Sequence, residues 1–242
     1  MVSKTQRKHI EQLGLNMLGA VQQSNYWNGK IGALSIVLNP AAGGLKRRSS
    51  VKKWLRDFSR AGVVAGIADD RSRLFYTDYV GQGIEIGRSL GRKACADDAS
   101  HLIVSCGGDG SHQELLTGLL QSDSATGRIQ ILRIPMGSGN DAADVASIQD
   151  AICILRGGAQ HSSVAAVETT LAGGERIYAF NIASFGLDAC VVALSNRFKR
   201  FRLMPGDSYK LAANILSLFY RPDFSHGPIV LEYTQAGEDN MP

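Results

Sequence analysis

The 242-residue sequence lacks the marks of a metal-cluster, membrane-spanning or nucleic-acid-binding protein. It has only four cysteines, without C-x-x-C spacing or a histidine partner. It has no apolar run of about 18 residues, the length that spans a bilayer, and no signal-peptide core follows its basic N-terminus. The formal net charge of +4 is too small to indicate nucleic-acid binding. These absences favour a reduced, cytoplasmic protein without a nucleic-acid partner.

The first 29 residues have the spacing of an amphipathic helix. Their apolar side chains recur at intervals of three and four, at Ile10, Leu13, Met17, Leu18 and Val21. We expect a helical N-terminal extension over residues 1–29, packed on the following domain and ending near Asn28-Gly29.

Apolar, β-branched runs then alternate with helical patterns. The predicted strands are 33–39, 73–77, 101–106 and 129–135, and the predicted helices are about 45–60, 81–93, 111–121 and 141–156. Such alternation is typical of a parallel α/β sheet. We therefore predict an α/β nucleotide-binding domain over residues 30–157.

The pattern changes after residue 157. Strand-like runs at 162–170, 175–186 and 227–234 are joined by glycine-rich turns, with one helical stretch at 208–220. This predicts a mostly-β, sandwich-like second domain over residues 158–242. The strands are too few for a complete sandwich, so we expect a fragment or a shortened domain.

Glycine-rich or polar loops follow all four strands of the predicted α/β domain, at 39–44, 77–78, 107–111 and 136–141. In open parallel sheets these loops share the carboxyl edge, where ligands bind. Glycine lets main-chain N–H groups approach phosphate oxygens at a helix N-terminus. The third loop is neither a Walker A sequence nor a dinucleotide fingerprint, because Gln113 replaces the last glycine of the latter.

Two further features of the third loop predict chemistry. Ser111 and Glu114 have the spacing of a capping box, with a role near the ligand as the alternative. Asp109 is the best-placed acid to hold Mg²⁺ or to accept a proton, against the alternative of an aspartate that only stabilises a turn.

Five ordered motifs carry a family resemblance. They are N-P-x-x-G at 39–43, a threonine element at 77–85, G-G-D-G-S-x-x-E at 107–114, P-x-G-S-x-N-D-x-A at 135–143 and an N-x-x-x-x-G-x-D-A segment at 181–189. Together they resemble the diacylglycerol kinase catalytic domain family, which includes sphingosine, ceramide and bacterial lipid kinases and is related to 6-phosphofructokinase and NAD kinase.

The resemblance implies ATP between an α/β domain and a β-sandwich, with Gly186 and Asp188 on the interdomain side. Asp109 is our candidate catalytic and Mg²⁺-binding residue. The candidate ATP-binding residues are Asn39, Gly43, Thr77, Gly107, Gly108, Asp109, Gly110, Ser111, His112, Gln113, Glu114, Gly137, Ser138 and Asn140.

The implied reaction is transfer of the γ-phosphoryl group of ATP to a lipid hydroxyl. The partner is then a lipid at a membrane surface, and the stretch 196–204 interleaves Arg197, Lys199, Arg200 and Arg202 with Phe198 and Phe201. A solvated basic face is the alternative for this stretch, and a homodimer stays open. The family's late D-G-E segment has no counterpart. Alternatives are therefore an NAD kinase-like enzyme with a soluble substrate, or a nucleotide-binding module without turnover.

Overall fold

The computed structural model describes residues 2–97, 100–122, 126–137, 140–170, 173–183, 189–194 and 214–215. The chain divides into two compact units, Met1–Asn181 and Ile182–Pro242. All the helices and strands named below belong to the first unit. The predicted division into 1–29, 30–157 and 158–242 stays a prediction.

A four-stranded parallel sheet is the centre of the first unit. Its strands are β1 (Ala33–Leu38), β2 (Ser72–Tyr76), β3 (His101–Gly107) and β4 (Ile129–Pro135), in the order β2-β1-β3-β4. Every residue of β1 and β3 is buried, as expected for the inner strands of a covered parallel sheet. The α/β prediction and all four of its strands are confirmed.

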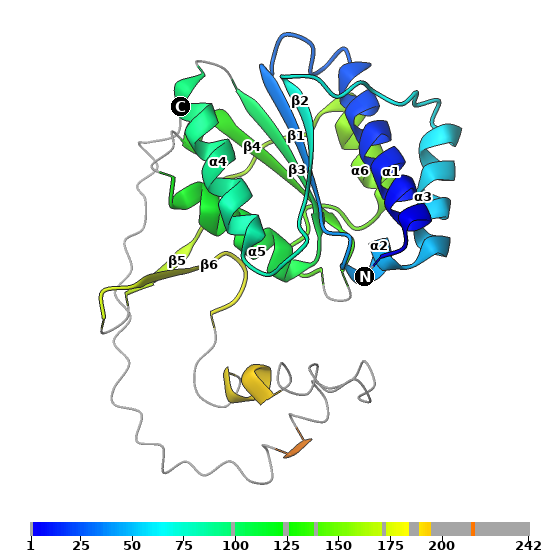
Figure 1. The fold of residues 1–242 in the computed structure, drawn as a ribbon. Coiled ribbons are helices and arrows are strands. Elements are labelled where there is room, and N and C mark those ends of the chain that lie inside the picture. The colour runs from blue at the N-terminus through cyan, green and yellow to red at the C-terminus, as the bar shows by residue number, and fades with distance from the viewer. Residues whose placement is uncertain are drawn as a thin grey trace. The chain divides into compact units, whose positions relative to one another are not determined.

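Helices cover both faces of this sheet (Figure 1). One face carries α1 (Lys4–Gln22), α3 (Arg48–Arg60) and α6 (Ile148–Gly157), and the other carries α4 (Gln82–Ala96) and α5 (Asp109–Leu120). Two short helices, α2 (Gly43–Lys46) and η1 (Thr126–Arg128), also belong to this unit. Each face has its own apolar cluster, one around α1, α3 and α6 and the other between the sheet, α4 and α5.

Helix α1 is an integral part of the core. Ile10, Leu13, Met17 and Leu18 are fully buried, as the apolar spacing predicts. The helix ends at Gln22, however, and not near Asn28. The Gln23 side chain there bonds the main chain of the extended segment after α3, with Nε2 donating to Val64 O at 2.7 Å and Oε1 accepting from Val64 N at 3.3 Å.

Helix α6 begins at Ile148, seven residues later than predicted. Residues 140–147 form turns, and three of their N–H groups bond residues distant in sequence and not the carbonyl groups four residues earlier. Asn140 N and Ala142 N donate to Asp109, and Asp144 N donates to Arg133 O. Ser147 is the N-cap of α6, and its hydroxyl accepts from Asp150 N at 3.2 Å.

The strands β5 (Val167–Thr170) and β6 (Arg176–Ala179) form an antiparallel hairpin, inside the two strand-like runs predicted there. The predicted strand at 227–234, and the helix at 208–220 except for residues 214–215, lie outside the described residues. Within the described part of the chain, no helix is long and apolar enough to cross a membrane.

Candidate nucleotide site

The loops after β1, β3 and β4 are joined at the carboxyl edge of the sheet by main-chain hydrogen bonds. Met136 N donates to Gly107 O at 2.7 Å, Gly44 N to Met136 O at 2.8 Å, and Asn39 N to Cys106 O at 3.0 Å. The loop after β2 reaches the same edge, where Thr77 N donates to Leu38 O at 3.0 Å. The structure thus brings the four predicted loops together.

Asn39 connects the first loop to the third. Its Nδ2 donates to Ser111 Oγ at 2.7 Å, and its Oδ1 accepts from Ala41 N at 2.9 Å. Both side chains are therefore used to hold loops in place. Gly43 is the first residue of α2, directly after the first loop.

Close packing explains two of the three glycines in the third loop. A Cβ on Gly107 would lie 2.5 Å from Ser111 Cβ, and a Cβ on Gly108 would lie 3.1 Å from Gly137 Cα. From the other side, a Cβ on Gly137 would lie 2.5 Å from Gly108 Cα. The third and fourth loops therefore touch main chain to main chain, which larger residues would prevent.

Gly110 has no such neighbour, because nothing lies within 4 Å of where its Cβ would be. It is exposed in the first turn of α5. The N–H groups of Gly108, Asp109 and Gly110 donate to no acceptor among the described residues, whereas Ser111 N and His112 N already donate to Gly108 O. Three adjacent free donors at a helix N-terminus are an arrangement of the kind that binds phosphate oxygens in proteins.

Asp109 organises the fourth loop. Its Oδ2 accepts from Asn140 N and its Oδ1 from Ala142 N, both at 2.9 Å. Asn140 has a φ of 131°, which is unusual for a residue other than glycine, and its Oδ1 accepts from Gly137 N at 2.8 Å. The two side chains together fix the loop beside the free N–H groups. Ser138, the predicted hydroxyl of this loop, lies outside the described residues, as do Gly186 and Asp188.

The predicted capping box is wrong. The N-cap of α5 is Gly108, and Ser111 is already the third residue of the helix. Glu114 instead reaches the neighbouring helix, where Oε1 accepts from Gly81 N at 2.9 Å and Oε2 from Gly83 N at 3.1 Å. Gly81 is the N-cap of α4, so Glu114 caps a helix other than its own and holds the loop that contains Thr77.

Replacing Glu114 by Ala should leave the N-terminus of α4 without this cap. We expect the free energy of unfolding to fall by about 2 kcal/mol, the upper range for a lost helix cap, and the melting temperature to fall by about 4–8 °C. Glu114→Gln, which keeps one acceptor, should lose about half as much. Thermal unfolding followed by circular dichroism measures both, and equal melting temperatures for wild type and Glu114→Ala would contradict the cap.

The side chains of His112 and Gln113 face away from the free N–H groups. His112 is fully buried, with Nδ1 2.8 Å from Ser105 Oγ, and burial lowers its pKa to about 4. The side-chain amide of Gln113 bonds the hairpin, donating to Tyr178 O and accepting from Phe180 N at 3.3 Å. His112 Nδ1 and the Gln113 amide therefore make contacts to β3 and to the hairpin, while contact of either residue with a nucleotide stays a prediction.

Thr77 retains an unused group at the site. Its Oγ1 is buried and has no hydrogen-bond partner among the described residues. A buried hydroxyl in this state is costly unless a ligand or water bonds it. This fits the prediction that Thr77 contacts a nucleotide.

Asp109 is the acid that could hold a metal here. No group of three or more His, Cys, Asp or Glu side chains that could hold a metal occurs within the described ranges. Mg²⁺, however, is commonly held by one or two carboxylates together with substrate phosphates. Each oxygen of Asp109 accepts one hydrogen bond from the described residues and keeps a second lone pair, so its chemistry fits this kind of site.

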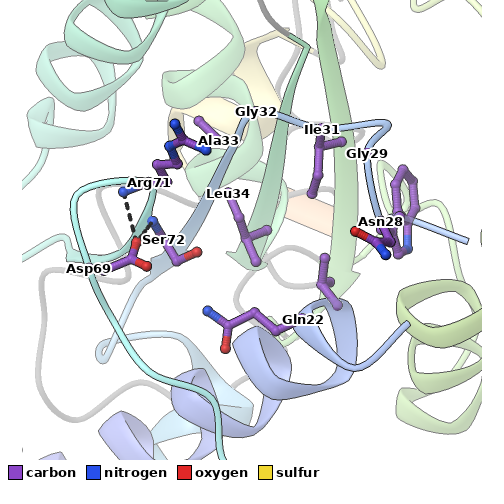
Figure 2. Close-up of a pocket in the computed structure, with 12 residues that line it drawn as sticks. Gln22, Asn28, Gly29, Ile31, Gly32, Ala33, Leu34, Asp69, Arg71 and Ser72 are labelled. Atoms are coloured by element: carbon purple, nitrogen blue, oxygen red, sulfur yellow. Dashed lines mark hydrogen bonds between the residues drawn. The ribbon is translucent and has the colours of Figure 1, made fainter. Parts of the chain in front are cut away.

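A cavity of about 260 Å³ lies at the opposite, amino edge of the sheet, beside the first residues of β1 and β2 (Figure 2). Its polar groups are largely satisfied within the protein. Asp69 Oδ1 accepts from Arg71 N and Ser72 N, and Gln22 bonds both N and O of Ile67. The free donors, by contrast, are at the carboxyl edge, and there we place the candidate site.

Comparison with protein families decides the assignment. The family model described as "Diacylglycerol kinase catalytic domain" matches residues 33–169, which contain the sheet and all four loops. The chain belongs to this family. No curated protein matches the sequence. Membership of this family supports the conclusion that the protein is a kinase, that is, a phosphotransferase of the diacylglycerol kinase and NAD kinase-like group. The family also implies use of ATP and usually of a divalent metal.

Two contacts near these loops do not follow from the sequence patterns. They are the hydrogen bonds of Gly81 N and Gly83 N to Glu114, and the ion pair of Arg133 with Asp144, whose Nη2–Oδ1 distance is 2.5 Å. The signal for Gly81 was its position before a helical pattern, because its φ of 91° suits glycine. The pairing of Arg133 with Asp144 has no signal in local sequence.

Proposed function

We propose that this protein is an ATP-dependent lipid kinase of the diacylglycerol or sphingoid type. The observation that carries the proposal is the row of free N–H groups at Gly108, Asp109 and Gly110, together with the unpartnered hydroxyl of Thr77 at the same edge of the sheet. The family match supports phosphoryl transfer. The lipid acceptor is the finer part of the proposal and is supported by the diacylglycerol kinase description of that family.

The main chain of the third loop would bind the phosphate oxygens of ATP, with the N-terminus of α5 adding partial positive charge. The hydroxyl of Thr77 would donate a hydrogen bond to the same nucleotide. Asn39 and Asn140 would act indirectly, because they hold the loops and leave the main-chain donors preorganised. Asp109 would hold Mg²⁺, which supplies neutralisation of the negative charge on the transferring phosphoryl group.

One assay separates this proposal from its two alternatives. The protein is incubated with γ-labelled ATP and, in separate reactions, diacylglycerol, sphingosine and NAD, while ATP binding is measured by calorimetry. We expect ATP binding and label in one of the two lipids. Label in NAD alone would replace the lipid acceptor by a soluble one. ATP binding without any label would support a nucleotide-binding module, and no ATP binding would contradict the site itself.

A lipid acceptor implies peripheral contact with a membrane in the cytoplasm, and this location stays a proposal. Formation of a homodimer also stays a proposal. The basic-aromatic stretch at 196–204 lies outside the described residues. Its contribution to membrane binding therefore stays a prediction from sequence.

A further inference from the structure

Helix α1 has basic residues at its N-terminus, where positive charge destabilises a helix. Lys4, Arg7 and Lys8 occupy the first five residues of the helix, and its first turn has no acidic residue. The N-terminus of a helix has partial positive charge, so anions stabilise it and cations destabilise it. Ser3 already provides a side-chain cap by accepting from Gln6 N at 3.2 Å. The cations therefore need another explanation than helix stability.

The same end of α1 is fixed at the carboxyl edge of the sheet. The buried Gln6 donates through Nε2 to Leu45 O of α2 at 2.5 Å. Arg7 pairs with Asp78, with Nη2 and Oδ2 3.3 Å apart, and its guanidinium lies 5.4 Å from the centre of the Tyr76 ring. The first turns of α1 thus lie against the loop that follows β2.

That loop exposes two apolar side chains directly after Asp78. Val80 is 93% exposed and Tyr79 is 55% exposed. The Tyr79 hydroxyl donates to Glu85 Oε2 at 2.6 Å, so its polar end is satisfied within the protein. A single exposed apolar residue is ordinary. Here two adjacent exposed apolar residues lie in a loop that contacts, through the pair of Arg7 with Asp78, a helix end with three basic residues.

We propose that Lys4, Lys8, Tyr79 and Val80 form a surface that binds an anionic phospholipid bilayer. The two lysines are exposed, and no ion pair joins either of them to another described residue. Cations attract anionic headgroups while an exposed aliphatic and an aromatic side chain enter the interface. Helix α1 begins with these cations because the bilayer, and not the helix dipole, is their partner.

This surface extends the proposed function, since it lies at the edge of the sheet that carries the free N–H groups. Thr77 and Val80 belong to one loop. Bilayer binding through Val80 would therefore place the carboxyl edge near the lipid from which an acceptor hydroxyl must come. Vesicle binding is measured without nucleotide. Loss of vesicle binding and loss of ATP binding can therefore be observed independently of each other.

The test is co-sedimentation of the full chain with vesicles of phosphatidylcholine containing about 30% phosphatidylserine, an anionic surface of the kind found on cytoplasmic leaflets. The double variant Lys4→Gln/Lys8→Gln should bind about 30-fold more weakly, because each surface cation contributes about 1 kcal/mol. Its charge-matched control is Lys53→Gln/Arg56→Gln on α3, which should bind like wild type. Raising the salt from about 0.1 M to about 1 M should weaken wild-type binding through screening.

Val80→Asp should weaken vesicle binding about tenfold, because it removes the side chain that enters the interface. Its control is Val64→Asp, an equally drastic change at a residue that is 68% exposed. Val64 lies against Gly19, 15 residues further along α1 than Lys4 and so about 22 Å away at 1.5 Å per residue. Val64→Asp should leave vesicle binding unchanged.

The lysine variant also carries its own folding control. Removing cations from a helix N-terminus should keep or slightly raise the melting temperature, so weaker vesicle binding could not result from unfolding. Three results would overturn the proposal: no binding of wild type to anionic vesicles, equal loss in the α3 control, or unchanged binding of the lysine variant. Concentration-dependent self-association that Val80→Asp abolishes would instead assign the surface to a second copy of the chain.

Discussion

Asp109→Asn should lower the rate of phosphoryl transfer by about 100- to 1,000-fold, the usual cost of removing one preorganised electrostatic group from a reacting site. ATP binding should weaken only about tenfold. The two carboxylate oxygens of Asp109 accept hydrogen bonds from the main-chain N–H groups of Asn140 and Ala142. An amide can accept only one of these, and the loss of one charge-assisted hydrogen bond is worth about 1.5 kcal/mol.

The matched control is Asp69→Asn. A single oxygen of Asp69 accepts from both Arg71 N and Ser72 N, so the amide can keep both bonds, and the residue lies at the amino edge of the sheet. Initial rates with the acceptor found in the three-substrate assay, and calorimetry with ATP, measure the two quantities separately. If Asp109→Asn transferred phosphate at nearly the wild-type rate, Asp109 would only be a loop-stabilising residue.

Gly110→Val should weaken ATP binding about 100-fold, as expected for loss of one or two charge-assisted hydrogen bonds to phosphate. Its side chain would stand in open space beside the free N–H groups, where nothing lies within 4 Å. For the same reason the melting temperature should not fall. Calorimetry and thermal unfolding of one preparation provide both values.

Two other glycines serve as comparisons for Gly110→Val. Gly157 at the end of α6 also has open space, so Gly157→Val should change neither binding nor stability. Gly108→Val should reduce both, since its Cβ would meet Gly137 Cα at 3.1 Å. ATP affinity of Gly110→Val equal to that of wild type would exclude the third loop as the phosphate site.

The sequence predicted the parts of this domain that depend on local pattern. Apolar β-branched runs located all four strands, and glycines after those runs located the loops, because both signals are read within a few residues. Local pattern did not predict the partners of long polar side chains. Glu114 has the spacing of a cap for its own helix but caps α4, and the side-chain amide of Gln113 bonds the hairpin.

Tertiary contacts also explain the misplaced helix ends. Residues 141–147 have a helical pattern, yet they form turns, because Asp109 accepts a hydrogen bond from the N–H group of Ala142. Gln23 similarly bonds Val64 where α1 stops. Competition between a local helix and a side chain distant in sequence cannot be read from periodicity.

In the function proposed here, main-chain N–H groups of the third loop bind the phosphates of ATP. Amide chemical shifts measured by NMR during titration with ATP and Mg²⁺ test it most directly. We predict the largest shifts at Asp109 and Gly110, whose N–H groups are free, and little change at Gly29 and Gly32 in the cavity at the amino edge. Saturable shifts at Gly29 and Gly32, with Asp109 and Gly110 unmoved, would contradict the site.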